Sequence, residues 1–201
     1  MLYKFREKLE THIDVTDEMW EYIRQDLTVL HVKRREKLVR FSELSRYIYF
    51  VVQGSFESSI LLPNGISKTV WFYLDKILDI ATCFDSIFLQ LPTKYEITAL
   101  EDSIVIRYTK KNIDKWGEKY NMIYKFGVHD IMEDFIATSE IRNHLISYSS
   151  KDFISYLSER YPIILDRIPD KNIAQFMGIT PEWFSKLKRQ LNGSDHSSNE
   201  L

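Results

Sequence analysis

The sequence contains a single cysteine, Cys83, among its 201 residues. One thiol cannot form a disulfide within the chain, and it cannot supply an all-cysteine zinc or iron–sulfur site. The five histidines show no clustering that would suggest a metal or haem site. We therefore expect no metal or other cofactor, and we expect Cys83 to be a small buried apolar residue.

Long apolar runs are also missing. The longest, such as residues 48–52 and 59–62, are far shorter than the roughly 20 residues of a membrane-spanning helix. The first residues are charged throughout and lack the apolar stretch and cleavage site of a secretory signal. The sequence therefore predicts a cytoplasmic protein without a membrane segment.

The common catalytic motifs are absent as well. The sequence has no His-Glu-x-x-His, Gly-x-Ser-x-Gly, P-loop or dinucleotide-binding pattern. A dispersed active site has no such pattern, so an enzyme is the first rival interpretation. We nevertheless expect a protein that is not an enzyme.

Charge is unevenly distributed, although the whole chain carries a net charge of only −2. Between residues 160 and 191 there are six basic residues and three acidic ones, whereas the rest of the chain is acidic. The basic residues are Arg160, Arg167, Lys171, Lys186, Lys188 and Arg189. A basic C-terminal segment on an acidic body is typical of a nucleic-acid-binding module attached to another domain.

The first 111 residues predict a β-rich domain with flanking helices. Up to about residue 30, apolar residues recur at steps of three and four, which predicts two short helices. From Tyr47 the chain is rich in β-branched and aromatic residues, and Asn64-Gly65 is a strong signal for a hairpin turn. Further strands are expected over residues 95–100 and 104–108, with a short helical insertion around 78–89.

Residues 112–147 predict one long helix that links two domains. Its stripe of side chains repeats every three or four residues and consists of Tyr120, Tyr124, Gly127, Ile131, Phe135 and Thr138. The stripe packs either on its own domain or on the same stripe of a second copy in a homodimer. Ser149 to Asp152 then predicts a capped helix that ends at Pro162, and the polar residues 192–201 predict a disordered tail.

Residues 170–191 form the most informative motif. A helix over 170–177 presents Ile173 to a core, and Gly178 can adopt the left-handed backbone that ends a helix in a tight turn. Thr180 is a good helix cap, and Pro181 is well suited to the first helical position. This arrangement predicts a helix-turn-helix, which places its second helix in the DNA major groove.

The exposed face of that second helix supplies the expected contacts to duplex DNA. Glu182 and Lys186 are the candidates for reading bases, because Glu accepts from cytosine and Lys donates to guanine. Lys171, Thr180, Lys188 and Arg189 would contact phosphates, which makes binding salt-dependent. The complete expected DNA-binding set is Lys171, Thr180, Pro181, Glu182, Trp183, Ser185, Lys186, Lys188 and Arg189.

The sequence as a whole resembles the Crp/Fnr superfamily of bacterial transcription regulators. The likeness lies in the helix-turn-helix segment, which reads Ile-Ala…Gly-Ile-Thr-Pro-Glu…Ser, and in the strand segment 50–54. It implies an α+β fold with a cyclic-nucleotide-binding-like β-roll over residues 1–111, a dimerisation helix over 112–147 and a DNA-binding domain over 148–191. It also implies a homodimer on a two-fold DNA site and, for an activator, contact with RNA polymerase.

The sequence departs from this family at two places. Cyclic-nucleotide-binding members hold the ribose and phosphate with a Gly-Glu pair and an Arg, but the corresponding positions here carry Asp79, Lys94 and Tyr95. Without the guanidinium, cyclic AMP is not expected. These three residues are candidates for another small-molecule effector pocket, against the simpler alternative of a structural ion pair and surface exposure.

The second departure is the wing that follows the recognition helix in the family. The sequence ends about ten residues after that helix, so the wing is either absent or a short hairpin around residues 166–169. A further rival interpretation is a β-roll whose C-terminal helices contact proteins rather than DNA. A steep loss of DNA binding with salt would distinguish the two.

Overall fold

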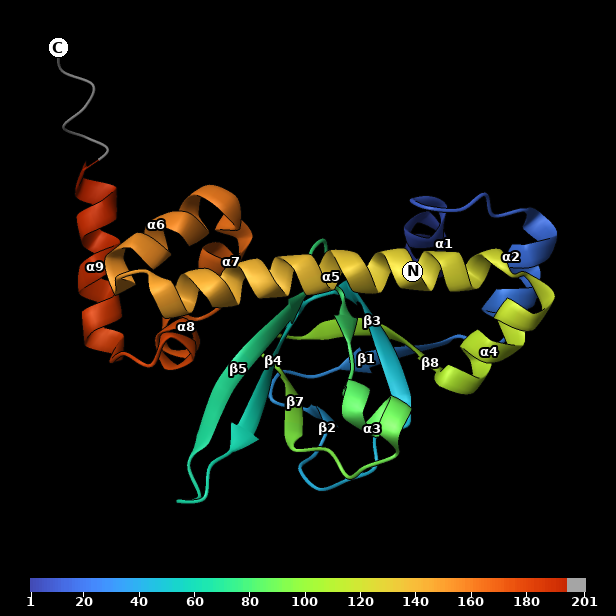
Figure 1. The fold of residues 1–201 in the computed structure, drawn as a ribbon, viewed down its shortest axis with the longest axis horizontal. Helices are drawn as coiled ribbons and strands as arrows, with labels where there is room; N and C mark the ends of the chain where they lie inside the picture. The colour runs from blue at the N-terminus through green and yellow to red at the C-terminus, as the bar shows by residue number, and fades with distance from the viewer. Residues whose placement is uncertain (195–201) are drawn as a thin grey trace, which may run out of the picture. The chain divides into compact units, whose positions relative to one another are not determined.

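The computed structural model describes the backbone of residues 1–194 and the side chains of residues 1–191. The chain divides into two compact units, Met1–Phe135 and Ile136–Leu201, which we call the N-unit and the C-unit. The division falls within helix α5, Met122–Ser147 (Figure 1).

The described residues of the N-unit contain two four-stranded antiparallel sheets, which confirms the expected α+β fold with a β-roll. One sheet has the strand order β1-β8-β3-β6, and the other has the order β2-β7-β4-β5 (Figure 1). The strands are β1 Thr28–Val32, β2 Lys37–Val39, β3 Tyr47–Gln53, β4 Ser55–Leu61, β5 Ser67–Leu74, β6 Ile80–Ala81, β7 Tyr95–Ala99 and β8 Ser103–Thr109.

Strand β3 is buried on both faces because it lies between two cores. Side chains alternate between the faces of a strand. Tyr49 and Val51 therefore join the core between the sheets, whereas Ile48, Phe50 and Val52 join a second core on the opposite face. This explains why residues 48–52 are continuously apolar instead of alternating with polar residues.

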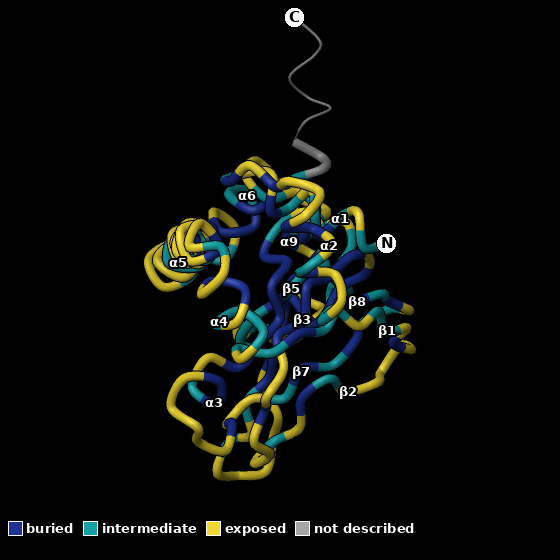
Figure 2. Tube along the Cα trace, turned by 90° about the vertical axis from the view of Figure 1, so that its right-hand side faces the viewer, coloured by how far each residue is buried: buried dark blue, intermediate teal, exposed yellow. Residues whose placement is uncertain are grey.

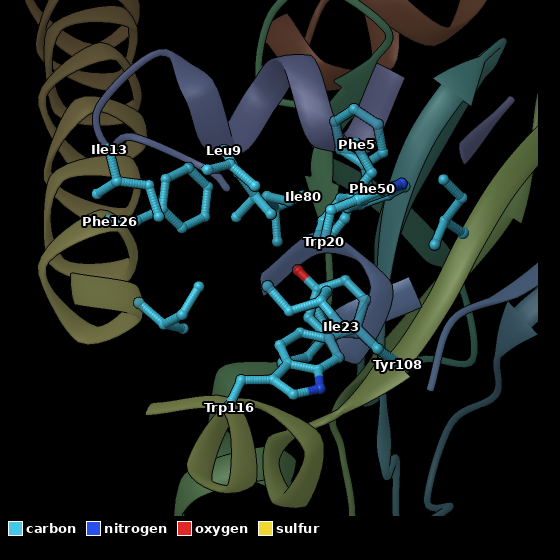
Figure 3. Close-up of a cluster of buried hydrophobic side chains, with 14 of the residues drawn as sticks. Phe5, Leu9, Ile13, Trp20, Ile23, Phe50, Ile80, Tyr108, Trp116 and Phe126 are labelled. Atoms are coloured by element: carbon cyan, nitrogen blue, oxygen red, sulfur yellow. The ribbon is translucent and has the colours of Figure 1, made fainter. Parts of the chain in front are cut away.

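The second core is covered by helices (Figure 3). Phe5 and Leu9 from α1, Ile23 from α2, Trp116 from α4 and Phe126 from α5 are all buried in it. The helices of the N-unit that precede α5 are α1 Leu2–Glu10, α2 Asp17–Arg24, α3 Phe84–Leu89 and α4 Lys110–Lys119.

Several local predictions are confirmed by this unit. The two N-terminal helices are present, and the Thr16 side chain caps α2 by accepting from the Met19 amide at 3.2 Å. The β4–β5 hairpin turns at Asn64-Gly65, where Gly65 has a φ of 80°. Strands β1 and β2 were not predicted, because β1 is a short run without turn signals at its ends and β2 has only three residues.

The prediction of one continuous helix over 112–147 is wrong. Helix α4 ends at Lys119, and α5 begins at Met122. The Tyr124 ring packs directly against Gly117, where no Cβ would fit, and the Tyr124 hydroxyl donates to the Asp114 carbonyl at 3.2 Å. This packing between the two helices is a tertiary effect, so the helical period alone could not reveal it.

The described part of the C-unit is entirely helical. After α5 it contains α6 Ser150–Arg160, α7 Pro162–Arg167, α8 Asp170–Met177 and α9 Pro181–Ser194. As predicted, Ser149 caps α6 by accepting from the Asp152 amide, and α6 ends just before Pro162. Helix α7, which begins at Pro162, was not predicted. Helix α9 continues to Ser194, so the disorder predicted for 192–194 is wrong; residues 195–201 lie outside the described residues.

Candidate nucleic-acid interface and sensor region

Helices α8 and α9 are joined by a tight turn whose geometry follows from its sequence. Gly178 has a φ of 70°, and its amide donates to the Gln175 carbonyl at 3.2 Å. The Ile179 amide donates to the Ala174 carbonyl at 3.0 Å. Because a left-handed residue closes α8 at this point, the chain reverses within three residues and α9 packs on α8.

The start of α9 is fixed by the cap that the sequence predicted. The Thr180 hydroxyl oxygen accepts from the Trp183 amide at 3.2 Å, and Pro181 is the first helical residue. Since the hydroxyl oxygen accepts this bond, the hydroxyl hydrogen stays available to donate to an external acceptor such as a phosphate.

The two sides of α9 differ sharply in exposure. Phe184 and Leu187 are buried in the C-unit. The opposite side carries exposed polar and aromatic residues, with Ser185 half-buried at its margin. The exposed residues are Pro181, Glu182, Trp183, Lys186, Arg189 and Gln190.

Five members of the expected DNA-binding set therefore lie on one surface, which we call the α9 face: Pro181, Glu182, Trp183, Lys186 and Arg189. Within this face, the Lys186 ammonium lies 5.2 Å from the centre of the Trp183 ring. The Arg189 Nε donates to the Ser185 carbonyl at 3.3 Å. Thr180 and Lys171 are also exposed, at the cap of α9 and in the first turn of α8 respectively.

Lys188 has a different environment from the other expected phosphate contacts. Its Nζ donates to the Asp170 carboxylate at 2.8 Å and to the Leu165 carbonyl at 3.2 Å. It thereby ties α9 to α8 and to α7. The sequence does not distinguish Lys188 from Lys186, because the partners of Lys188 are 18 and 23 residues away along the chain.

The wing hairpin considered around residues 166–169 is not formed. These residues include the end of α7 and the start of the Ile168–Pro169 connection to α8, and the described residues of the C-unit contain no strand. The Ile168 side chain is buried and its amide donates to the Ile164 carbonyl at 3.0 Å. Ile168 and Pro169 have extended backbone angles, so they join α7 to α8 directly and leave no room for a hairpin.

An aromatic cluster connects the end of α5 to the helices that support α9. The His144 ring stacks on Tyr156 at a centroid distance of 3.9 Å, and Tyr148 meets His144 edge-on at 4.5 Å. The Tyr161 hydroxyl donates to the Glu140 carboxylate at 3.2 Å. These contacts fix the C-terminal end of α5 within the C-unit.

Much of helix α5 is exposed (yellow in Figure 2), and several of its exposed residues are apolar. In the N-unit its buried side chains include Ile123, Phe126 and Asp130, which face the roll and its covering helices. A different stripe is exposed and consists of Tyr124, Val128, Ile131, Met132 and Phe135, with exposed fractions between 40% and 62%. Of the predicted stripe, Ile131 and Phe135 are exposed, whereas Tyr124 also packs on Gly117 of α4 and Tyr120 meets Tyr22 at 5.8 Å.

In the N-unit, Asp79 is part of a buried ion cluster. The Lys8 ammonium lies 3.1 Å from the Asp79 carboxylate and 2.7 Å from the Asp130 carboxylate, so one lysine bridges α1, the roll and α5. Burial raises the pKa of Asp79, and the Lys8 charge opposes that effect. The sequence missed Lys8 because it lies far from both partners along the chain.

The other two pocket candidates lie apart from this cluster. Lys94 and Tyr95 are exposed at the start of β7, and the Tyr95 amide donates to the Thr93 hydroxyl at 3.0 Å. In the described residues no hydrogen bond or ion pair joins either side chain to Asp79. The arrangement corresponds to the simpler alternative of a structural ion pair and two surface residues.

Other features of the described residues bear on possible ligands. Cys83 is buried as expected, and burial raises the pKa of its thiol to about 11. Among the described residues there is no group of three or more His, Cys, Asp or Glu side chains placed to hold a metal ion. None of the described helices is both long and apolar enough to span a membrane.

Comparison with known proteins identifies the fold. A β-roll of two antiparallel sheets followed by a long helix and a helical unit is the architecture of the Crp/Fnr regulators, and many solved structures with this architecture match the chain. The structure of FixK2 from Bradyrhizobium japonicum matches with a TM-score of 0.69 and 16% identity, over 84% of this chain and 86% of that one.

Two further matches extend the comparison. A putative Crp/Fnr-family regulator from Eubacterium rectale has a TM-score of 0.64 and 17% identity, over 90% of this chain and 85% of that one. The Thermus thermophilus catabolite activator protein has a TM-score of 0.53 and 11% identity, over 94% of this chain and 88% of that one. No family model and no curated protein sequence matches the chain. The expected resemblance to the Crp/Fnr fold is thus confirmed at the level of structure.

Proposed function

We propose that this protein is a transcription regulator of Crp/Fnr type that binds duplex DNA through the α9 face. The observation that carries the proposal is this face itself: a capped helix, held rigidly by the Gly178 turn, with Glu182, Lys186 and Arg189 exposed on it. The N-terminal end of such a helix can enter the major groove and bring its side chains to base edges.

In this proposal the roles on the α9 face are divided. Lys186 donates to guanine acceptors and Glu182 accepts from a cytosine amino group. Arg189, Lys171 and the Thr180 hydroxyl contact phosphates and fix the position of the helix. Lys188 is assigned to the internal contacts with α8 and α7 instead, because its ammonium group already has two partners there.

The proposed active form is a homodimer paired through the exposed stripe of α5. Five large apolar side chains at helical spacing are typical of a helix that packs on another. Pairing of two α5 helices would hold the two α9 helices about 34 Å apart, which is one turn of DNA. In this proposal, residues 1–111 form the sensor domain, residues 112–147 the dimerisation segment and residues 148–191 the DNA-binding domain. If the protein activates transcription, it would also contact RNA polymerase.

Within the sensor domain, we propose that cyclic AMP is not the effector. The position where a family member would hold the ribose carries Asp79, whose carboxylate is bound by Lys8. Moreover, the exposed Lys94 stands where such a member has an arginine, whose guanidinium would bind the cyclic phosphate. A protein of this type would act in the cytoplasm and would not be an enzyme.

The test is selection of bound duplexes from a random pool at about 150 mM salt, since affinity for DNA depends strongly on salt. We expect recovery of a motif with two-fold symmetry, and loss of that motif with the Lys186→Glu variant. The matched control is Lys151→Glu, which changes an exposed lysine of the C-unit outside the α9 face. Binding that is non-specific and equally strong for all three proteins would contradict the proposal and favour a protein-contact role for the C-unit.

A further inference from the structure

Trp183 is an exposed indole in the first turn of α9. Its side chain is 43% exposed, whereas the other aromatic residue of this helix, Phe184, is fully buried. The contribution of Trp183 to the helix cap comes from its backbone amide, which donates to Thr180. Any residue other than proline supplies such an amide, so the cap does not require an indole.

The contact with Lys186 does not explain the exposed ring either. The ammonium lies 5.2 Å from the ring centre, and an exposed cation–π pair contributes only about 0.5–1 kcal/mol. A consequence of this contact is that ring and ammonium are presented together, one helical turn apart, on the same side of α9. The α9 face therefore offers a flat apolar surface beside a hydrogen-bond donor.

This pair of groups matches the chemistry of the major groove. A lysine recognises the N7 and O6 acceptors of guanine, and apolar side chains recognise the C5 methyl group of thymine, which no other base carries. We propose that the Trp183 ring packs on the thymine methyl group next to the base pair contacted by Lys186. Trp183 would thereby make a T·A base pair part of each half-site. This assignment rests on the proposed DNA-binding function and adds one specificity determinant to it.

The experiment uses the full-length protein and the duplex obtained from the selection described above. At each thymine of the half-site in turn, deoxyuridine replaces thymidine in both halves, which removes only the methyl group. For the wild type we expect one position at which this exchange weakens binding about four-fold per half-site, the factor that corresponds to burying one methyl-sized group. With two half-sites the combined loss is about 15-fold.

Two variants separate the ring from the indole N–H. Trp183→Phe keeps an apolar ring and should retain the sensitivity to deoxyuridine, whereas Trp183→Ala should bind both duplexes equally. The control is Ile66→Ala, which removes an apolar side chain that is 59% exposed and lies in the turn between β4 and β5; it should behave as the wild type does. Because the alanine variant loses only a partly exposed ring and its contact with Lys186, its thermal unfolding midpoint should fall by no more than about 4 °C, which is checked by circular dichroism.

The outcomes distinguish this inference from the proposed function. Specific binding by the wild type with no deoxyuridine effect at any position would overturn the role of Trp183 and leave the proposed function standing. The same holds if the deoxyuridine effect persists undiminished in Trp183→Ala. Absence of any specific duplex in the selection would overturn both the proposed function and this inference.

Discussion

The two units use charged side chains in opposite ways. In the N-unit, Lys8 is enclosed between Asp79 and Asp130, and its partners are nearly buried. In the C-unit, Glu182, Lys186 and Arg189 lie exposed on the α9 face. A buried charge must be compensated within the fold, whereas an exposed one is free to be compensated by a ligand. The comparison therefore separates charges that hold the structure from charges available for recognition.

The largest expected effect is at the buried cluster. Lys8→Met leaves two carboxylates close together without their cation, so we expect the free energy of unfolding to fall by about 3–5 kcal/mol. Urea denaturation at a fixed protein concentration measures the change in free energy, since the proposed dimer would make stability depend on concentration. Lys125→Met, at an exposed position of α5, is the control and should change stability by less than about 0.5 kcal/mol. Equal stability of the two variants would show that the Lys8 cluster is not structurally important.

A smaller effect is expected at Asp134, on the same side of α5. Burial, together with the like charges of Asp130 and Asp79, raises the pKa of Asp134 to about 7, and Lys8 only partly offsets this. A carboxyl whose pKa is raised by folding destabilises the folded state when ionised. The protonated Asp134 carboxyl therefore stabilises the folded state relative to the ionised one. This stabilisation is fully present below the ordinary pKa of an aspartate and is lost as pH rises through about 7, the raised pKa of Asp134.

Asp134→Asn removes the ionisation and tests this sign. Above pH 7 the variant should be more stable than the wild type by about 2 kcal/mol, a value discounted for the partial exposure of the residue. The difference should shrink as pH falls towards 5, below the raised pKa of about 7. Thermal unfolding followed across this pH range measures it. A difference that does not change with pH would argue against the raised pKa.

The smallest stability effect, and the sharpest test of the comparison, concerns two lysines of α9. Lys188→Ala should lower the free energy of unfolding by about 1 kcal/mol, because its partners Asp170 and Leu165 lose an internal donor. Lys186→Ala should lower stability less, by about 0.5 kcal/mol, because it loses only an exposed contact with the Trp183 ring, but it should weaken DNA binding. If the two lysines changed both properties alike, the distinction between structural and recognition charges within α9 would fail.

Features that depend on neighbouring residues could be predicted from the sequence. Gly178, Thr180 and Pro181 specify the turn and the start of α9 through backbone conformation and capping, and both are present as predicted. The Asn64-Gly65 turn was predictable for the same reason. The apolar stripe of α5 and the basic bias of the C-terminal segment were also visible, because helical spacing and charge are properties of neighbouring residues.

Features that join residues far apart along the chain depend on tertiary packing and could not be predicted. The break between α4 and α5 depends on the Tyr124 ring packing on Gly117, and the Lys8 cluster joins residues more than 70 positions apart along the chain. Likewise, the sequence gives Lys186 and Lys188 the same chemistry, and only the fold turns one towards Asp170 and leaves the other exposed. The physical reason is that burial and ion pairing depend on which surfaces meet, and one-dimensional periodicity carries no such information.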